Sequence, residues 1–319
     1  MSELAAGAFT PTLASRPDRD LLQALLADKR SPYTRRAYRR DLYDFFRTMA
    51  GADPNPQLVA EFLRLDRYSA LSVVLEYKAH LQDRGLAEAT INRRLAAIKS
   101  LVNYARQIGR CDYSLQDITG ERVRPYRDTA GISAEAFRAM LAVPDSRTLK
   151  GKRDRALLLV LWGNALRRGE LARTNIADWD RAAATLRIYG KGEGKQAQTV
   201  SLGAQAQAAL AAWIDARGEA EGRAPLFCST HRGYWGRRLS TTSLYQIVRR
   251  AATAAGIDRP LGPHQIRHSA ITAALDRTGG DVRKVQKLSR HAKLETLSIY
   301  DQGRLNAQQT VTELLDELV

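Results

Sequence analysis

The chain has 319 residues, with 50 Lys and Arg against 34 Asp and Glu, a formal net charge of +16 and a pI near 10.1. Its 44% hydrophobic content argues against wholesale disorder, and its longest apolar run, Ala156–Trp162, is far shorter than a membrane span. The acidic start shows no secretion signal, and Cys111 and Cys228 form neither a disulfide framework nor a metal cluster. We therefore expect a cytoplasmic protein with no membrane partner.

The positive charge is spread over the whole chain. The first 130 residues carry 21 basic and 16 acidic side chains, and the remaining residues carry 29 and 18. Such an excess attracts polyanions and adds salt-dependent affinity through counterion release. Solubility alone is the alternative interpretation. The distribution favours nucleic acid as the partner, contacted by both halves.

The first half has a helical pattern after a start, residues 1–17, that we expect to be flexible. Within Thr34–Met49 one helical stripe is apolar, formed by Tyr38, Leu42, Phe45 and Met49. Three arginines lie off this stripe: Arg36, Arg39 and Arg40. They are candidate DNA contacts, although a solvated helix face is an equally good interpretation.

A second helix is predicted over Thr90–Arg110, with Thr90 as its N-cap. Its buried face would consist of Ile91, Leu95, Ile98, Val102 and Ala105. Arg93 and Arg94 fall in its first turns, where a helix N-terminus favours phosphate, so both are candidate DNA contacts. The first half is therefore predicted to be an all-helical bundle.

A polar stretch without periodicity, Gly120–Gly131, indicates a linker. Beyond it, Ser133 is predicted to cap a helix through Leu141, and Arg153–Gly163 to form a buried helix. Thr185–Leu202 is typical of a β-hairpin with a glycine-rich centre. Further helices are predicted near 204–217, 240–255, 263–276 and 281–290, and a last amphipathic stretch contains Val311, Leu314, Leu315 and Leu318. The fold is predicted to be mainly α with a small β-sheet.

Metal and nucleotide chemistry find little support in the sequence. His264 and His268 have the i, i+4 spacing of zincins, but Gln265 replaces the glutamate base and no cysteine pair is present. No carboxylate cluster suits a magnesium nuclease, and Gly190-Lys191-Gly192 lies in a hairpin rather than before a helix. We therefore expect no cofactor. The remaining candidates are cations and one tyrosine: Arg167, Lys191, His264, Arg267, His291 and Tyr300.

The order and spacing of these residues are distinctive, although each alone has an ordinary explanation. Arginine in Ala-Leu-Arg-x-Gly-Glu-Leu, lysine in a Gly-Lys-Gly hairpin, His-x-x-Arg, a second histidine and a tyrosine nine residues later follow one another from Arg167 to Tyr300. This series resembles the tyrosine recombinase (phage integrase) family, in particular its simple Xer-like two-domain members. Thr34–Phe46 and Thr90–Leu95 are similar to that family's helical core-binding domain.

The resemblance implies a domain organisation and a partner. It gives a SAM-like core-binding domain at 18–118, a linker at 119–131 and a mixed α/β catalytic domain at 132–319. The terminal helix would dock on a neighbouring protomer, producing a tetramer on double-stranded DNA. Docking of that helix on its own domain is the alternative.

The resemblance also implies a role for each site residue. Arg167 and Arg267 would bind the non-bridging phosphate oxygens, and His264 and His291 would add hydrogen bonds. Lys191, or Lys195 beside it, would protonate the departing 5′-hydroxyl. Tyr300 would form a 3′-phosphotyrosine bond, so that strands are cut and rejoined without metal or ATP. A type IB topoisomerase and a non-catalytic DNA-binding protein with this fold are the rival functions.

Three local features complete the expectation. Arg290 stands where many family members have glycine, which would alter the turn before His291. Nine residues of continuous helix would leave His291 and Tyr300 on opposite faces, so we expect a break at Ala292–Thr296 before a short helix. Glu170 is expected to orient its surroundings, for instance by holding a cation or a backbone amide.

Overall fold

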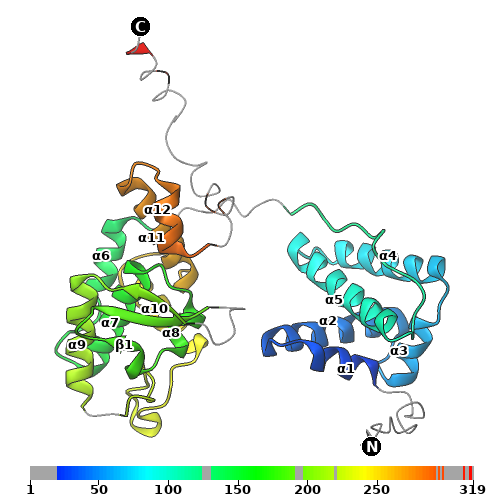
Figure 1. Cartoon of the computed structure of the whole chain (residues 1–319), viewed down its shortest axis with the longest axis horizontal. Coiled ribbons are helices and arrows are strands. Elements are labelled where there is room, and N and C mark those ends of the chain that lie inside the picture. The colour runs from blue at the N-terminus through cyan, green and yellow to red at the C-terminus, as the bar shows by residue number, and fades with distance from the viewer. Residues whose placement is uncertain are drawn as a thin grey trace, which may run out of the picture. The chain divides into compact units, whose positions relative to one another are not determined.

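The computed structural model describes residues 20–123, 131–190, 197–218 and 221–291, together with Leu294, Leu297, Thr312, Asp316 and Glu317. The chain divides into two compact units, Met1–Arg124 and Pro125–Val319 (Figure 1). Each unit has its own hydrophobic core. Among the described residues, no helix combines the length and apolar character needed to cross a membrane.

The described part of the first unit is a helical bundle. Its helices are α1 (Leu21–Asp28), α2 (Pro32–Ala50), α3 (Pro56–Leu63), α4 (Arg67–Asp83) and α5 (Glu88–Gln107). Polar side chains cap the first four by accepting a backbone N–H of the first turn; these residues are Asp20, Ser31, Asn55 and Asp66. Proline begins α2 and α3, where its missing N–H costs no hydrogen bond. The sequence therefore specifies the helix starts locally.

Aromatic rings fill the centre of this bundle. Phe45 packs edge-to-face against Phe46, Phe62 and Tyr77, each with ring centroids 5.1 Å apart. Leu42 and Phe45 of the predicted stripe are buried, and Tyr38 and Met49 pack against the same core. The predicted cap of α5 is wrong: the helix begins at Glu88, and the N–H of Thr90 donates to the carbonyl of Ala87 at 2.8 Å.

The stretch predicted as a linker begins attached to the first unit. The Asn92 side chain accepts the N–H of Glu121 at 2.6 Å and donates to its carbonyl at 2.8 Å. Lys78 also pairs with the Glu121 carboxylate at 2.8 Å. Residues 124–130 lie outside the described residues. The chain thus remains bound to α4 and α5 as far as Glu121.

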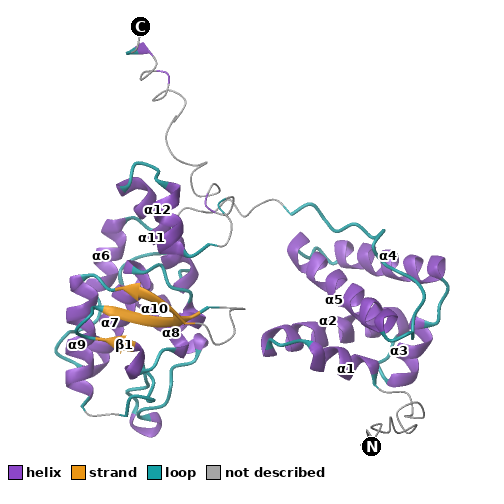
Figure 2. Ribbon diagram, in the orientation of Figure 1, coloured by secondary structure: helices purple, strands orange, loops and turns teal. Residues whose placement is uncertain are grey.

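The second unit combines helices with a small antiparallel sheet (Figure 2). Its helices are α6 (Ala134–Ala142), α7 (Leu149–Gly163), α8 (Arg168–Arg173), α9 (Ala204–Arg217), α10 (Thr241–Ala254), α11 (Pro263–Arg277) and α12 (Val282–Ser289). The strands β1 (Trp179–Asp180), β2 (Thr185–Tyr189) and β3 (Ala197–Ser201) pair in that order. The mainly α prediction with a small sheet and the hairpin is confirmed; the two-residue β1 is additional.

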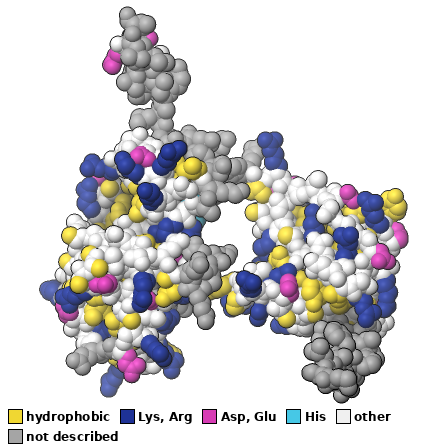
Figure 3. Space-filling view, in the orientation of Figure 1, with side chains coloured by type: hydrophobic (Ala, Val, Ile, Leu, Met, Phe, Trp, Pro, Cys, Tyr) yellow, Lys and Arg dark blue, Asp and Glu magenta, His cyan; other side chains and the backbone are white. Residues whose placement is uncertain are grey.

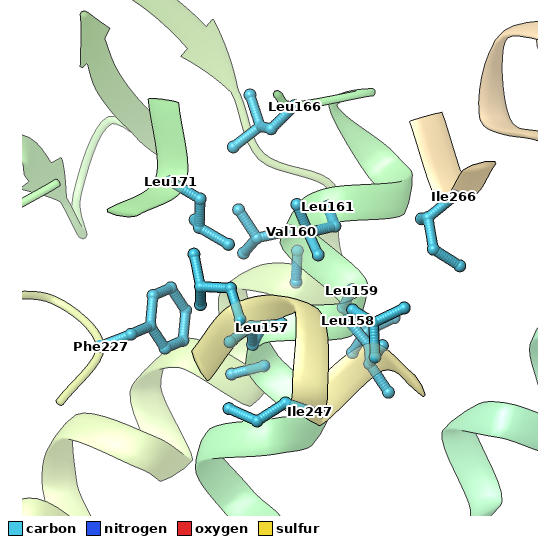
Figure 4. Close-up of a cluster of buried hydrophobic side chains, with 14 of the residues drawn as sticks. Leu157, Leu158, Leu159, Val160, Leu161, Leu166, Leu171, Phe227, Ile247 and Ile266 are labelled. Atoms are coloured by element: carbon cyan, nitrogen blue, oxygen red, sulfur yellow. The ribbon is translucent and has the colours of Figure 1, made fainter. Parts of the chain in front are cut away.

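Helix α7 lies at the centre of the second core. Its residues Ala156–Leu161 are all buried, which explains why the sequence is apolar around the whole helix there. Figure 4 shows this run surrounded by side chains from neighbouring elements, including Phe227, Ile247 and Ile266. Leu166, in the connection between α7 and α8, and Leu171, in α8, are buried in the same core. This packing fixes the backbone from which Arg167 projects.

A separate small cluster lies between α11, α12 and the α7–α8 connection. It contains Ala165, Ala270, Ile271, Leu275, Val285 and Leu297. Leu297 is fully buried there, three residues before Tyr300 in the sequence. The cluster therefore supports the elements that carry the candidate site residues.

Candidate functional site

Arg167 is the N-cap residue of α8 and projects from a buried connection. Glu170 accepts hydrogen bonds from the Arg167 backbone N–H at 2.9 Å and from its Nη1 at 2.7 Å. The Arg167 side chain nevertheless keeps 40% of its surface exposed. Arg167 is therefore oriented by the protein and still open to an anion.

The connection that precedes Arg167 has an unusual backbone. Ala165 has a φ of 44°, in the left-handed region that few non-glycine residues adopt. Next to it, Nδ2 of Asn164 donates to the carbonyl of Ser201, at the end of β3, at 2.6 Å. The turn at Ala165 leaves its carbonyl available as an acceptor for α11.

Arg267, on α11, donates a hydrogen bond to this carbonyl of Ala165. Its side chain is only 2% exposed, and it donates Nη1 to the carbonyl of Ala165 and Nη2 to the carbonyl of Ser289. Nη2 also lies 3.1 Å from Nε2 of His291. One planar guanidinium thus joins the α7–α8 connection, the end of α12 and the second histidine.

His291 lies two residues after the last residue of α12. Its carbonyl accepts a hydrogen bond from Nε2 of Gln286 at 3.0 Å. Burial, followed by the positive charges of Arg267 and Arg167, lowers the pKa of His291 to about 4. At neutral pH the imidazole is therefore uncharged and has one N–H to donate.

His264 lies in the first turn of α11, beside its partner His268. The two Nε2 atoms are 2.7 Å apart, and the rings meet edge-to-face with centroids 4.2 Å apart. Desolvation of its ring, followed by the charges of Arg267 and Arg167, lowers the pKa of His264. The same two arginines thus act on both histidines, so these four side chains form one electrostatic neighbourhood.

This neighbourhood is suited to an oxyanion. Two permanent cations and two uncharged imidazoles offer several N–H donors to one anionic group, as phosphate recognition requires. Among the described residues, no group of three or more His, Cys, Asp or Glu is arranged to hold a metal ion. Within the described ranges, no third ligand joins His264 and His268, whose spacing alone resembles that of zincins.

The other predicted catalytic residues lie outside the described residues. Lys191 and its alternative Lys195 fall in the connection between β2 and β3, and Tyr300 follows the buried Leu297. The predicted break at Ala292–Thr296 also lies outside, apart from Leu294. Within the described part, the helix already ends at Ser289, one residue before the predicted end.

The predicted DNA-binding arginines divide into two groups. Arg36, Arg39 and Arg40 lie exposed on α2, in a unit whose visible surface carries many Lys and Arg side chains (Figure 3). Arg93 is half-buried and pairs with the buried carboxylate of Asp41. Arg94 is only 9% exposed and pairs with Asp44 while contacting the Tyr77 hydroxyl at 3.2 Å. Burial therefore corrects the expectation that Arg94 lies on a phosphate-binding surface.

Sequence reasoning missed the importance of Arg290. Its side chain reaches Glu170 at 3.0 Å and so enters the same network as Arg167. The sequence marked Arg290 only as a departure from glycine in the turn before His291, and nothing in it indicated the contact with Glu170. Glu170 does hold a cation, as expected, and it holds two.

Comparisons with known proteins identify the family of both units. The phage integrase family matches residues 132–306, and the phage integrase N-terminal SAM-like domain matches residues 19–109. A tyrosine recombinase of Synechococcus elongatus is 49% identical over 319 residues, the full length of both chains. The tyrosine recombinase XerC of Pelobacter propionicus is 30% identical over 270 residues, covering 85% of this chain and 84% of that protein.

Solved structures share the fold. The XerH site-specific recombinase bound to palindromic difH substrate aligns with a TM-score of 0.64 at 21% identity, covering 89% of this chain and 80% of that one. A lambda integrase dimer bound to a COC′ core site aligns with a TM-score of 0.64 at 16% identity, covering 89% and 94%. With family matches in both halves and a full-length relative at 49% identity, the chain belongs to the phage integrase family and is an enzyme of the tyrosine recombinase class.

Proposed function

We propose that this enzyme is a site-specific recombinase that cleaves and rejoins duplex DNA through a covalent bond between Tyr300 and a 3′-phosphate. One observation carries the proposal: the Arg267 guanidinium lies 3.1 Å from Nε2 of His291, donates to the carbonyl of Ala165 two residues before Arg167, and projects from the helix that also carries His264. A scissile phosphate bound among these four groups would meet donors on several sides. The family membership supports the same chemistry.

The two arginines have complementary properties for this reaction. Arg267 is buried and already oriented by two backbone carbonyls, so little side-chain entropy is lost when phosphate binds. Arg167 is more exposed and can adjust to the substrate. Both would stabilise the charge that develops on the non-bridging oxygens in the transition state.

The bond changes balance without an added reactant. The Tyr300 phenolic oxygen attacks phosphorus, the bond from phosphorus to the 5′-oxygen breaks, and a 3′-phosphotyrosine forms. The phenolic proton passes to His264, which is uncharged at neutral pH, and Lys191 supplies a proton to the departing 5′-oxygen. Attack by a 5′-hydroxyl of another strand reverses these steps, so rejoining needs no ATP and no metal.

The first unit would hold the duplex through the exposed arginines of α2: Arg36, Arg39 and Arg40. Phosphate contacts of this kind fix the register of a protein on DNA without reading its sequence. We propose that the protein acts on DNA in the cytoplasm.

Recombination would require several protomers, and we propose a tetramer joined through the C-terminal stretch with Val311, Leu314, Leu315 and Leu318, most of which lies outside the described residues. Deleting residues 307–319 should weaken cooperative binding to a two-site duplex more than binding to a single half-site. Equal losses in the two titrations would contradict this assembly.

The covalent step can be tested directly. A duplex selected by the protein from a random pool is incubated with it and then denatured in detergent, and a DNA-linked protein band is expected. Tyr300→Phe should abolish the band while binding persists. Tyr234→Phe is the matched control, because it alters an exposed tyrosine elsewhere in the second unit. This variant should still form the DNA-linked band.

The same preparation separates the rival functions. Exchange of strands between two labelled duplexes supports recombination, whereas adduct formation with supercoil relaxation and no exchange would indicate a topoisomerase. Binding without an adduct would indicate a non-catalytic DNA-binding protein. An adduct that persists in Tyr300→Phe would assign the nucleophile to another residue.

A further inference from the structure

Arg290 has a backbone conformation that glycine usually adopts. It follows α12 with φ 56° and ψ 39°, the left-handed conformation that commonly ends helices. For a residue with a Cβ this conformation is unfavourable, so surrounding contacts must offset its cost. Its N–H donates to the carbonyl of Gln286 at 2.7 Å, which satisfies one end of the helix but does not require an arginine.

The Arg290 guanidinium supplies the missing contacts. Nη1 donates to the carbonyls of Leu288 at 2.8 Å and Asn164 at 3.0 Å. Nη2 donates to Glu170 at 3.0 Å and to the carbonyl of Ala165 at 3.4 Å. The side chain is 10% exposed, so these bonds are shielded from water. Arg290 therefore ties the end of α12 to the α7–α8 connection that presents Arg167.

Glu170 links Arg290 to Arg167. Its buried carboxylate receives Arg167 on both oxygens and Arg290 on one of them. Burial alone would raise the pKa of Glu170, but the charge of Arg290 and then the hydrogen bonds and charge of Arg167 outweigh it, so the pKa is lowered. The carboxylate is thus ionised and shared by two cations.

This sharing determines how strongly Glu170 retains Arg167. Without Arg290, the buried carboxylate of Glu170 would be paired with Arg167 alone among these three residues. Because a buried charge without compensation is costly, the remaining pair would become more important to the protein. Arg167 would then be held more tightly by Glu170 and would be less available to phosphate. Arg290 also sits next to His291, so its loss would release the backbone that carries the second histidine.

We propose that Arg290 is a positioning residue for strand cleavage: through Glu170 it sets the pose of the Arg167 guanidinium, and through the Asn164 and Ala165 carbonyls it aligns His291 with the same connection. The inference rests on the proposed function. It assigns to this chain a third arginine that acts on the reaction without touching the DNA.

The first experiment measures single-turnover adduct formation on the selected duplex, with binding and thermal unfolding in parallel. Arg290→Gly suits the left-handed backbone, so the fold should persist. We expect the rate at saturating DNA to fall at least tenfold, while the dissociation constant changes less than threefold. Arg290→Lys restores a cation near Glu170 and should recover part of the rate, whereas Arg290→Ala should not. Arg283→Ala, which removes an exposed charge from α12, should match the wild type.

A second experiment tests whether Arg290 acts through Arg167. Arg167→Lys keeps the charge but removes the planar fork, and adding Arg290→Gly to it should lower the rate by less than a further threefold. If the double variant loses rate by the product of the two single-variant factors, the inference is overturned. A wild-type cleavage rate in Arg290→Gly would also overturn it, and so would a loss of DNA affinity or of folded protein as large as the loss of rate. If the wild type itself forms no adduct, the proposed function fails instead.

Discussion

Nη2 of Arg267 lies 3.1 Å from Nε2 of His291, and the same guanidinium donates to the carbonyls of Ala165 and Ser289. The Arg267 guanidinium, which we expect to contact the scissile phosphate, therefore also joins α11 to the α7–α8 connection and to the end of α12. Arg167 is far more exposed, and within the described residues its guanidinium hydrogen-bonds the side chain of Glu170, three residues later in the same helix turn. The two arginines should respond differently to the same substitution.

Arg267→Lys should lower the free energy of unfolding by about 2–4 kcal/mol, because one ammonium replaces the two separate nitrogens that donate to the carbonyls of Ala165 and Ser289. Arg167→Lys should cost less than about 1 kcal/mol, because its side chain is partly solvated. Both should slow adduct formation on the order of 100-fold. Denaturant unfolding together with single-turnover cleavage measures the two effects. Equal losses of stability would contradict the assigned difference in burial.

Stability should depend on pH through His291. Its pKa is about 4 in the folded protein and close to 6.5 in an unfolded chain, so between these values the unfolded state binds the additional proton. The stabilising contribution is complete above pH 6.5 and is lost as the pH falls toward 4, by about 1–2 kcal/mol after allowing for solvent screening. Unfolding titrations at several pH values should show a shallower slope for His291→Gln. An unchanged slope would assign the effect to other groups.

The arginines of the first unit should separate into a structural and a binding group. Arg94→Met breaks the pair with Asp44 but leaves that carboxylate near Arg84, and it should lower the unfolding free energy by about 1–3 kcal/mol. Arg36→Ala should change stability by less than about 0.5 kcal/mol. It should instead reduce the slope of log affinity against log salt by about 1. If Arg36→Ala has the same slope of log affinity against log salt as the wild type, Arg36 does not contact the DNA.

Gly131 should be intolerant of a side chain because of its position against α11. An added Cβ would lie 2.6 Å from the Cα of Ser269, whose hydroxyl accepts the N–H of Ile132. Gly131→Ala should therefore destabilise the second unit by about 1–3 kcal/mol. Gly169→Ala is the matched control, since open space surrounds that position in α8 and alanine favours a helix. Thermal unfolding compares the two variants, and equal midpoints would contradict the contact.

Much of the fold follows from local patterns in the sequence. The stripe through Leu42 and Phe45 predicts α2, and the apolar run after Arg153 predicts a buried α7, because periodicity and burial are properties of a short segment. The two-residue β1 is too short to produce a pattern. The start of α5 was misplaced because Ala87 caps it without a side-chain bond, while Thr90 has the residue type of a cap.

The site was predictable as a set of residues but not as a network. The order of motifs predicts Arg167, His264, Arg267 and His291 as site residues. The burial of Arg94 depends on Asp44, fifty residues earlier in the chain, and no local pattern reports that pairing. The contacts of Arg290 likewise depend on Asn164 and Glu170, which the fold brings to it from a distant segment.

The acceptors that hold Arg267 are main-chain oxygens of Ala165 and Ser289. Replacing either side chain removes no acceptor, because every amino acid carries the same carbonyl. What can disturb the grip is a change in the path of the backbone, above all at Ala165, whose left-handed turn directs its oxygen toward α11. A substitution at Ala165 or Ser289 should therefore disturb Arg267 only where it changes the path of that turn or of the end of α12.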